Sequence, residues 1–271
     1  NYFAPNDAVS LFFIASGVGL ATVILGGNRY ALSILIGSGI SNTFGGLPSA
    51  TAFTMGLGSM LGAIVGAYCL KTQKNFNNAL PSLADWLRVV IYGGAVGCAV
   101  NAVIGVSALW ISGVIATEMF WHKVFSWWMG DTLGVIVITP FALIWGKFRF
   151  SKINFAQALE GLFILGLTFL AGQAVFLGWF HTHIGEVANT YWIFLFMVWV
   201  AVRLNKAWMT LVITMISLQA LQGVYSELGI FNSDFVENRA LNYWFFIIVL
   251  SSVGITLNTY ITAQQEALER L

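Results

Sequence analysis

Residues 125–141, FSWWMGDTLGVIVITPF, place two tryptophans, a glycine and an aspartate inside a stretch that is otherwise apolar. The length and apolar character of this region predict a helix that crosses a membrane. A carboxylate at membrane depth costs about 3 kcal/mol unless it is protonated, hydrated or paired. Asp131 is therefore a candidate functional residue, and its partner is the first thing to identify.

The composition of the whole chain agrees with a membrane protein. Hydrophobic residues make up 58% of the 271 positions and charged residues 8%, and the mean hydropathy is +0.82. A water-soluble globule needs more polar surface than this composition supplies. The net charge is only +1, and the basic residues are scattered along the chain, which argues against a nucleic-acid partner. Cys69 and Cys98 fall in apolar segments, as free thiols in packed helices do.

Apolar runs between charged or turn-rich breaks predict an all-α integral membrane protein in which the lipid bilayer surrounds about nine helices. The predicted segments are residues 8–26, 30–46, 50–70, 87–113, 119–146, 157–180, 188–204, 206–223 and 240–262.

The distribution of charged residues predicts how these segments are oriented. Basic residues gather in every second connection, and acidic residues gather in the others. By the positive-inside rule, this alternation places the N-terminus outside and the C-terminus in the cytoplasm. The basic set is Arg29, Lys71, Lys74, Arg88, Lys147, Arg149, Lys152, Arg203 and Lys206, and the acidic set is Asp7, Glu118, Glu186, Glu227, Asp234 and Glu237.

Arg203, in VWVAVRL, is the charge we expect to reach the depth of Asp131. We predict that Asp131 is ionised and paired with Arg203, beneath a pocket walled by Trp127 and Trp128. In the alternatives, Asp131 is protonated and bonded to an amide or faces a water-filled cavity, and Arg203 is an interfacial anchor. Pro140 removes one backbone hydrogen bond and is expected to bend the inner half of this helix.

Glycines and amides inside the segments predict close helix packing. Small residues four apart let helices approach closely, and amide side chains usually bond between helices. Asn42 and Asn101 are also candidates for contact with a ligand. The glycines concerned are Gly58, Gly62, Gly66, Gly93, Gly97, Gly130 and Gly134, and the other amides are Gln173, Gln219 and Gln222.

Two other polar clusters predict little chemistry. His181, His183 and Glu186 have spacing that resembles a metal site, but a short outer loop of this kind is usually solvated. His122 lies beside Trp121, as in an interfacial aromatic belt. Neither a nucleophile with a base nor a paired carboxylate has usable spacing, so we expect this segment to have no catalytic residue, metal or cofactor.

The C-terminal sequence TLNTYITAQQEALERL, residues 256–271, is rich in helix formers and contains neither glycine nor proline. Five residues of this sequence, named below, are spaced by four, three, four and three positions. This spacing is the a/d pattern of a coiled coil. A lone amphipathic surface helix is the alternative. We therefore divide the chain into a transmembrane region, 1–256, and the start of a cytoplasmic linker, 257–271, that pairs in a homodimer and continues toward a cytoplasmic domain absent from this chain. The set is Leu257, Ile261, Gln264, Leu268 and Leu271.

Four stretches of the sequence resemble the first type of membrane-associated sensor domain, the MASE family of bacterial signalling proteins. WWMGDTLGVIVITP is similar to a WWxGDxxGxxxxxP motif, and SGVGLATVILGGNRYALSILIGSGISN, SLADWL and VWVAVRL match weaker motifs. The resemblance extends over almost the whole chain. It implies a sensory input domain in the bacterial inner membrane, joined in the full protein to a diguanylate cyclase, a phosphodiesterase or a histidine kinase. It does not identify the stimulus, which could be a small molecule or a protein.

Two further function classes are weighed against a sensor. A small-molecule transporter or channel would explain the intramembrane charge and the glycine-rich helices, but no internal repeat is visible and a coiled-coil exit has no use in a carrier. A purely structural membrane anchor would need far fewer than nine helices. A signal receiver that passes a shift of its last helix to a cytoplasmic domain is the function that these patterns favour.

Overall fold

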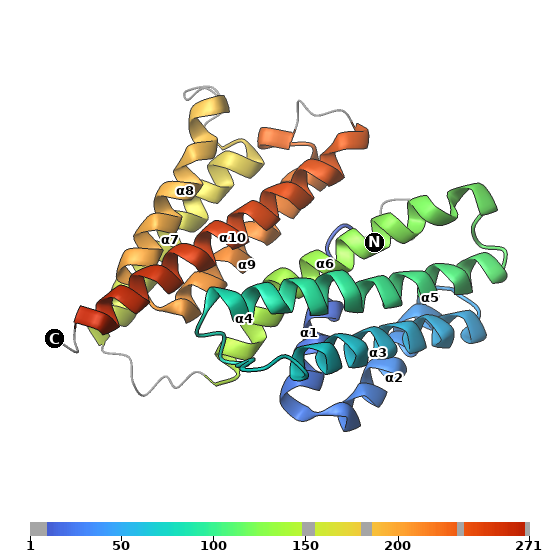
Figure 1. Ribbon diagram of the computed structural model, residues 1–271. Helices are drawn as coiled ribbons and strands as arrows, with labels where there is room; N and C mark the ends of the chain where they lie inside the picture. The colour runs from blue at the N-terminus through green and yellow to red at the C-terminus, as the bar shows by residue number, and fades with distance from the viewer. Residues whose placement is uncertain (1–9, 148–154, 180–185, 232–235, 269–271) are drawn as a thin grey trace. The chain divides into compact units, whose positions relative to one another are not determined.

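A computed structural model describes residues 10–147, 155–179, 186–231 and 236–268 of the chain. All regular structure in these ranges is helical (Figure 1). The chain divides into two compact units, Asn1–Leu143 and Ile144–Leu271. Each unit is a helical bundle with its own core.

The first unit contains six α-helices and one π-helix. Its longest α-helix, α6, continues through Pro140. The α-helices are α1 (Ile14–Gly26), α2 (Ala31–Phe44), α3 (Ser49–Lys71), α4 (Leu83–Arg88), α5 (Cys98–Ile111) and α6 (Phe120–Trp145), and the π-helix is Val89–Gly97.

The π-helix joins α4 to α5, so that Leu83–Ile111 is one continuous helical stretch. Its wider turns displace backbone carbonyls from their usual partners, which is why such segments often mark functional sites. At the start of the stretch, the side chain of Ser82 accepts a hydrogen bond from the backbone N–H of Asp85, and Arg88 pairs with Asp85 at 3.0 Å. The helix therefore begins at a capped, charged end and changes geometry where it enters the apolar bundle.

Glycines at the centre of the first unit let backbones touch, as the sequence predicts. A Cβ on Gly62 of α3 would lie 2.6 Å from the carbonyl oxygen of Gly97, and a Cβ on Gly97 would lie 2.8 Å from that of Gly62. Gly66 approaches the Cα of Gly93 in the same seam. Close packing of α3 on the continuous helix is therefore confirmed.

The second unit contains four long helices, α7 (Phe155–Leu177), α8 (Glu186–Arg203), α9 (Lys206–Ser226) and α10 (Val236–Leu268). Asn205 caps the start of α9 by accepting from the N–H of Ala207. Asn258 of α10 is fully buried and donates to the carbonyl oxygen of Leu204, at 3.0 Å. The turn between α8 and α9 is therefore held by an amide from the last helix.

The predicted segments each coincide with a helix in the described residues, and the all-helical, multi-pass membrane class is confirmed. In the described part of the chain, six helices are long and apolar enough to cross a bilayer: Ser49–Lys71, Leu83–Ile111, Thr117–Trp145, Ala158–Leu177, Lys206–Ser226 and Arg239–Gln265. The α1 helix has 13 residues and α2 has 14, which at ~1.5 Å per residue is shorter than the ~30 Å core of a bilayer. A total of nine crossings stays a prediction.

The first helix also begins later than the sequence predicts. Within the predicted range 8–26, residues 8 and 9 lie outside the described residues, and the helix starts only at Ile14. Phe13 is extended, with φ −102° and ψ 91°, and its N–H donates to the carbonyl oxygen of Gly130 at 3.1 Å. An apolar run continues through these residues, but a backbone hydrogen bond to α6 replaces the first helical turn.

Candidate ligand-binding site

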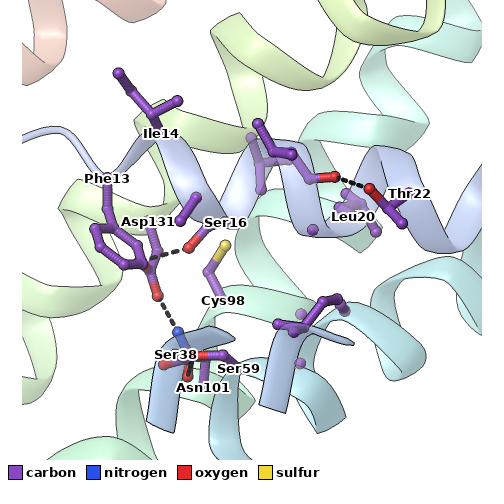
Figure 2. Close-up of a pocket in the computed structure, with 18 of the residues that line it drawn as sticks. Phe13, Ile14, Ser16, Leu20, Thr22, Ser38, Ser59, Cys98, Asn101 and Asp131 are labelled. Carbon is purple, nitrogen blue, oxygen red and sulfur yellow. Dashed lines mark hydrogen bonds between the residues drawn. The ribbon is translucent and has the colours of Figure 1, made fainter. Parts of the chain in front are cut away.

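Asp131 lies in the middle of α6 with 1% of its surface exposed. The hydroxyl of Ser16 in α1 donates to Oδ1 at 2.7 Å, and Nδ2 of Asn101 in α5 donates to Oδ2 at 2.6 Å. The hydroxyl of Ser59 in α3 donates to Oδ1 of Asn101 at 3.2 Å. Both carboxylate oxygens accept hydrogen bonds, which is the arrangement that an ionised group needs. The carboxylate thus joins α6 to α1 and α5, and Asn101 extends the network to α3 (Figure 2).

Residues on either side of Asp131 in the sequence donate hydrogen bonds to the π-helix. The indole N–H of Trp128 donates to the carbonyl oxygen of Ala95 at 3.0 Å, and the hydroxyl of Thr132, one helical turn later, donates to that of Gly94 at 3.3 Å. Helical residues four apart share a face, so this spacing matches two neighbouring carbonyls. Two side chains of the WWMGDT sequence therefore supply donors to a segment whose own hydrogen bonding is irregular.

The glycines of this sequence bring α1 against α6. A Cβ on Gly134 would lie on the carbonyl oxygen of Phe13, and a Cβ on Gly130 would lie on that of Ser10. Gly17 of α1 approaches the carbonyl oxygen of Gly134 in the same way, and the hydroxyl of Thr139 donates to the carbonyl oxygen of Gly17 at 3.0 Å. These contacts fix α1 at the distance from which Ser16 reaches Asp131.

A cavity of about 590 Å³ opens beside Asp131. In Figure 2, Ser16, Ser38, Ser59, Asn101 and Asp131 lie together at one end, and Leu20 and Thr22 lie at the other. A volume of a few hundred Å³ is typical of a small-molecule site. Its lining comes from α1, α2, α3, α6 and the helical stretch that contains the π-helix, and includes Gly19, Ile34, Gly37, Asn42, Ala63, Cys98 and Val135.

Two of the predicted site residues, both tryptophans, lie outside the lining of this cavity. Trp127 and Trp128 do not line the cavity that Asp131 lines. Trp127 packs against Leu109 and lies over Gly105, where a Cβ would be 2.8 Å from the ring. Trp128 is turned toward the π-helix. Trp127 faces α5. Trp128 points about 100° further around α6, as the next residue of a helix does, and faces the π-helix.

Asp131 and Arg203, predicted to pair with each other, each bind other partners within their own unit. Nε of Arg203 binds Oε1 of Glu160 in α7 at 2.7 Å, and its Nη2 donates to Oε2 at 3.2 Å. Both partners belong to the second unit, and the Arg203 side chain is 58% exposed. Arg203 therefore holds α8 against α7, whereas Asp131 is satisfied by Ser16 and Asn101.

The other predicted polar residues have separate positions. Asn42 lines the cavity, and its Nδ2 donates to the hydroxyl of Ser38 at 3.2 Å. Gln219 donates to the carbonyl oxygen of Phe169, which is an interhelical bond of the expected kind. Gln173 is buried, and Gln222 is exposed. Of the predicted amides, Asn42 and Asn101 line the cavity.

The sequence reasoning did not assign Ser16, Ser59, Cys98 or Thr132 to the site. Hydroxyls are common in membrane helices and usually bond to their own helix, as that of Thr22 bonds to the carbonyl oxygen of Val18. The one available signal was the SG pair of the first helix, residues 16 and 17, which belongs to a motif already noted.

The remaining predicted residues that the structure describes do not line this cavity. Leu257, Ile261, Gln264 and Leu268 belong to α10, and Leu271 lies outside the described residues. His181 and His183 also lie outside them, and the side chain of Glu186 is not described. Among the described residues no group of three or more histidine, cysteine or acidic side chains could hold a metal ion.

The fold and site define a multi-pass helical membrane protein with a carboxylate at a buried cavity. The MASE1 family model matches residues 2–265, nearly the whole chain. The chain therefore belongs to the MASE1 family of membrane sensory domains, as the resemblance implies. No curated protein and no solved structure matches the chain significantly.

Proposed function

We propose that this chain is the sensory input domain of a bacterial signal-transduction protein in the inner membrane. The first unit receives the stimulus at the Asp131 cavity. The second unit passes a shift of α10 to a cytoplasmic output domain, which is a diguanylate cyclase, a phosphodiesterase or a histidine kinase. We also propose that the N-terminus lies outside the cell membrane and the C-terminus lies in the cytoplasm.

The observation that carries this proposal is the continuity of α10. This helix has 33 residues, Val236–Leu268, which at ~1.5 Å per residue is roughly 50 Å and exceeds the ~30 Å core of a bilayer. Its N-terminal half is packed into the second unit, where Tyr243 and Leu250 are fully buried. Its last turns extend the same rod to Leu268, which is 70% exposed. A rod anchored at one end transmits rotation or translation to whatever is joined at the other.

A change of helical phase tests this transmission. In a chimera that joins a diguanylate cyclase domain after Leu271, inserting four residues rotates the output by about 40° relative to the helix, whereas inserting seven nearly restores the heptad phase. We expect the four-residue insertion to lock cyclic-di-GMP synthesis on or off and the seven-residue insertion to retain the parent level. Cyclic-di-GMP measured in cells gives the readout. Equal output from all three proteins would contradict the proposal.

The substitution Gln264→Cys tests both dimerisation and orientation. Gln264 is exposed on α10, and it lies in the a/d set of the predicted coiled coil. We expect the introduced thiol to form a disulfide with its symmetry mate in native membranes under mild oxidation. A membrane-impermeant maleimide should label this thiol only after the cells are opened. The parent, which keeps buried Cys98 and partly buried Cys69, is the control. A persistent monomer argues against pairing, and labelling of intact cells argues against a cytoplasmic end.

A further inference from the structure

Asp131 has no described cation as its partner. The ion pairs among the described residues join Arg88 to Asp85, Arg203 to Glu160 and Arg239 to Glu227. The side chains that line the cavity include Asp131 and no lysine, arginine or histidine. A buried carboxylate is stabilised by hydrogen bonds from Ser16 and Asn101, but it still favours a positive charge close by. The polar end of the cavity is therefore selective against anions.

The rest of the cavity is shaped for an apolar body. Beyond the polar end, the lining consists mainly of small and aliphatic residues. A volume of about 590 Å³ is many times the ~30 Å³ that a water molecule occupies in the liquid. A bare ion would leave most of this apolar space without a contact. The aliphatic and glycine lining includes Gly19, Leu20, Ile34, Ala63, Gly93 and Val135.

We propose that the cavity binds an organic ammonium ion, a primary or secondary amine that carries an apolar group. The ammonium lies beside Asp131 and can donate to the hydroxyls of Ser38 and Ser59, which line the same end. The apolar group extends past Leu20 and Val135. This ligand class rests on the proposed sensory role of the site. A free amine and the ethanolamine headgroup of a phospholipid share this chemistry.

Three probes with the same phenyl group but different charge test the inference. Phenethylamine is a cation, 2-phenylethanol is neutral and phenylacetate is an anion. The full chain is placed in nanodiscs of phosphatidylglycerol, which has no amine, and binding is titrated by saturation-transfer NMR. We expect phenethylamine to bind at least tenfold more tightly than 2-phenylethanol, and phenylacetate to bind more weakly than both. Absence of binding, equal binding or preference for the anion would overturn the proposal.

Two variants locate the binding. Asp131→Asn is expected to lower the affinity for phenethylamine to that of 2-phenylethanol, because it removes the charge and keeps the shape. Glu118→Gln makes the same charge change at an exposed position outside the cavity and should leave the affinity unchanged. Preference for the amine that persists in Asp131→Asn would overturn the proposal.

A blocking variant keeps the test decisive if Asp131→Asn does not fold. Gly37 lines the cavity, and a Cβ there meets no atom within 4 Å. Gly37→Leu should therefore occupy the space without disturbing the backbone and should reduce phenethylamine affinity at least tenfold. Gly166 in α7 also has open space around it and does not line the cavity, so Gly166→Leu should bind like the parent. Equal affinity in both leucine variants would overturn the proposal.

The source of the amine is distinguished by repeating the titration with phosphatidylethanolamine in the nanodiscs. A lower affinity for phenethylamine would identify the lipid headgroup as a competitor, and an unchanged affinity would identify a free amine. Binding is measured without any output domain. If amines bind but the phase insertions in α10 have no effect, the ligand class survives and the signalling function fails. The reverse result would retain the signalling function and exclude the amine.

Discussion

Replacing Gly134 with valine should nearly abolish recovery of folded protein. A Cβ at this position would clash with the carbonyl oxygen of Phe13, and the next helical turn of α1 places Gly17 against the carbonyl oxygen of Gly134. Both obstacles are backbone atoms, so α1 as a whole must move away from α6. Overpacking of a core usually costs about 1–3 kcal/mol when side chains can adjust. Here we expect a larger loss, because displacing α1 also removes Ser16 from Asp131.

Two matched glycine variants define the scale of this effect. A Cβ on Gly93 would meet the end of the Leu20 side chain, which can rotate, and a Cβ on Gly166 meets open space. We expect Gly93→Ala to lower the unfolding midpoint in SDS modestly and Gly166→Val to leave it close to that of the parent. Fluorescence-detected size exclusion of tagged proteins measures the folded yield. A normal yield for Gly134→Val would show that α1 does not pack on α6 at this point.

The sequence predicts the positions of the long helices because a membrane span is a long, uninterrupted run of apolar residues. Long apolar runs located every long helix of the described chain. The π-helix was missed because Val89–Gly97 has the same apolar composition as an α-helix, and its difference lies in backbone hydrogen bonding. The donors that compensate for it, Trp128 and Thr132, lie further along the chain, in α6.

The residues of the site were only partly predictable for a similar reason. Asp131 was conspicuous because an isolated carboxylate is rare in an apolar helix. Arg203 is the partner that the sequence predicts, because an opposite charge is the simplest way to stabilise a buried carboxylate. Glu160 was overlooked because it falls inside the predicted segment 157–180 near its start, where it can bind Arg203 at 2.7 Å. Asn101 is one of several amides in the apolar segments, and the SG pair of the first helix is the only signal for Ser16, so neither can be identified from the sequence as the partner of Asp131.

Asp131 and Asn101 should be strongly coupled in a double-mutant cycle. Asn101→Leu removes the donor to Oδ2, at 2.6 Å, and leaves a buried carboxylate with an unmet acceptor. Asp131→Leu leaves the Asn101 amide and the Ser16 hydroxyl without their acceptor. Each single change should lower the free energy of unfolding by about 2–3 kcal/mol. The double variant should lose less than the sum, because replacing both partners with apolar groups removes the unmatched atoms together.

The size of the coupling also reports the charge of Asp131. Hydrogen bonds between neutral groups in membrane proteins average about 0.6 kcal/mol in such cycles, whereas hydrogen bonds to charged groups are worth about 1.5–3 kcal/mol. We expect a coupling free energy above about 1.5 kcal/mol, measured from unfolding in SDS, which indicates an ionised carboxylate. A value near 0.6 kcal/mol would indicate a protonated one.

Arg203 supplies the control that separates this network from the ion pair first expected. Its guanidinium binds Glu160, and neither group touches Ser16, Asn101 or Asp131 in the described contacts. Residues that share no partner and do not touch are usually additive within about 0.5 kcal/mol. Arg203→Gln combined with Asp131→Leu should therefore give the sum of the two single effects. Coupling between Asp131 and Arg203 as strong as that between Asp131 and Asn101 would restore the charge pair and refute the amide–hydroxyl network.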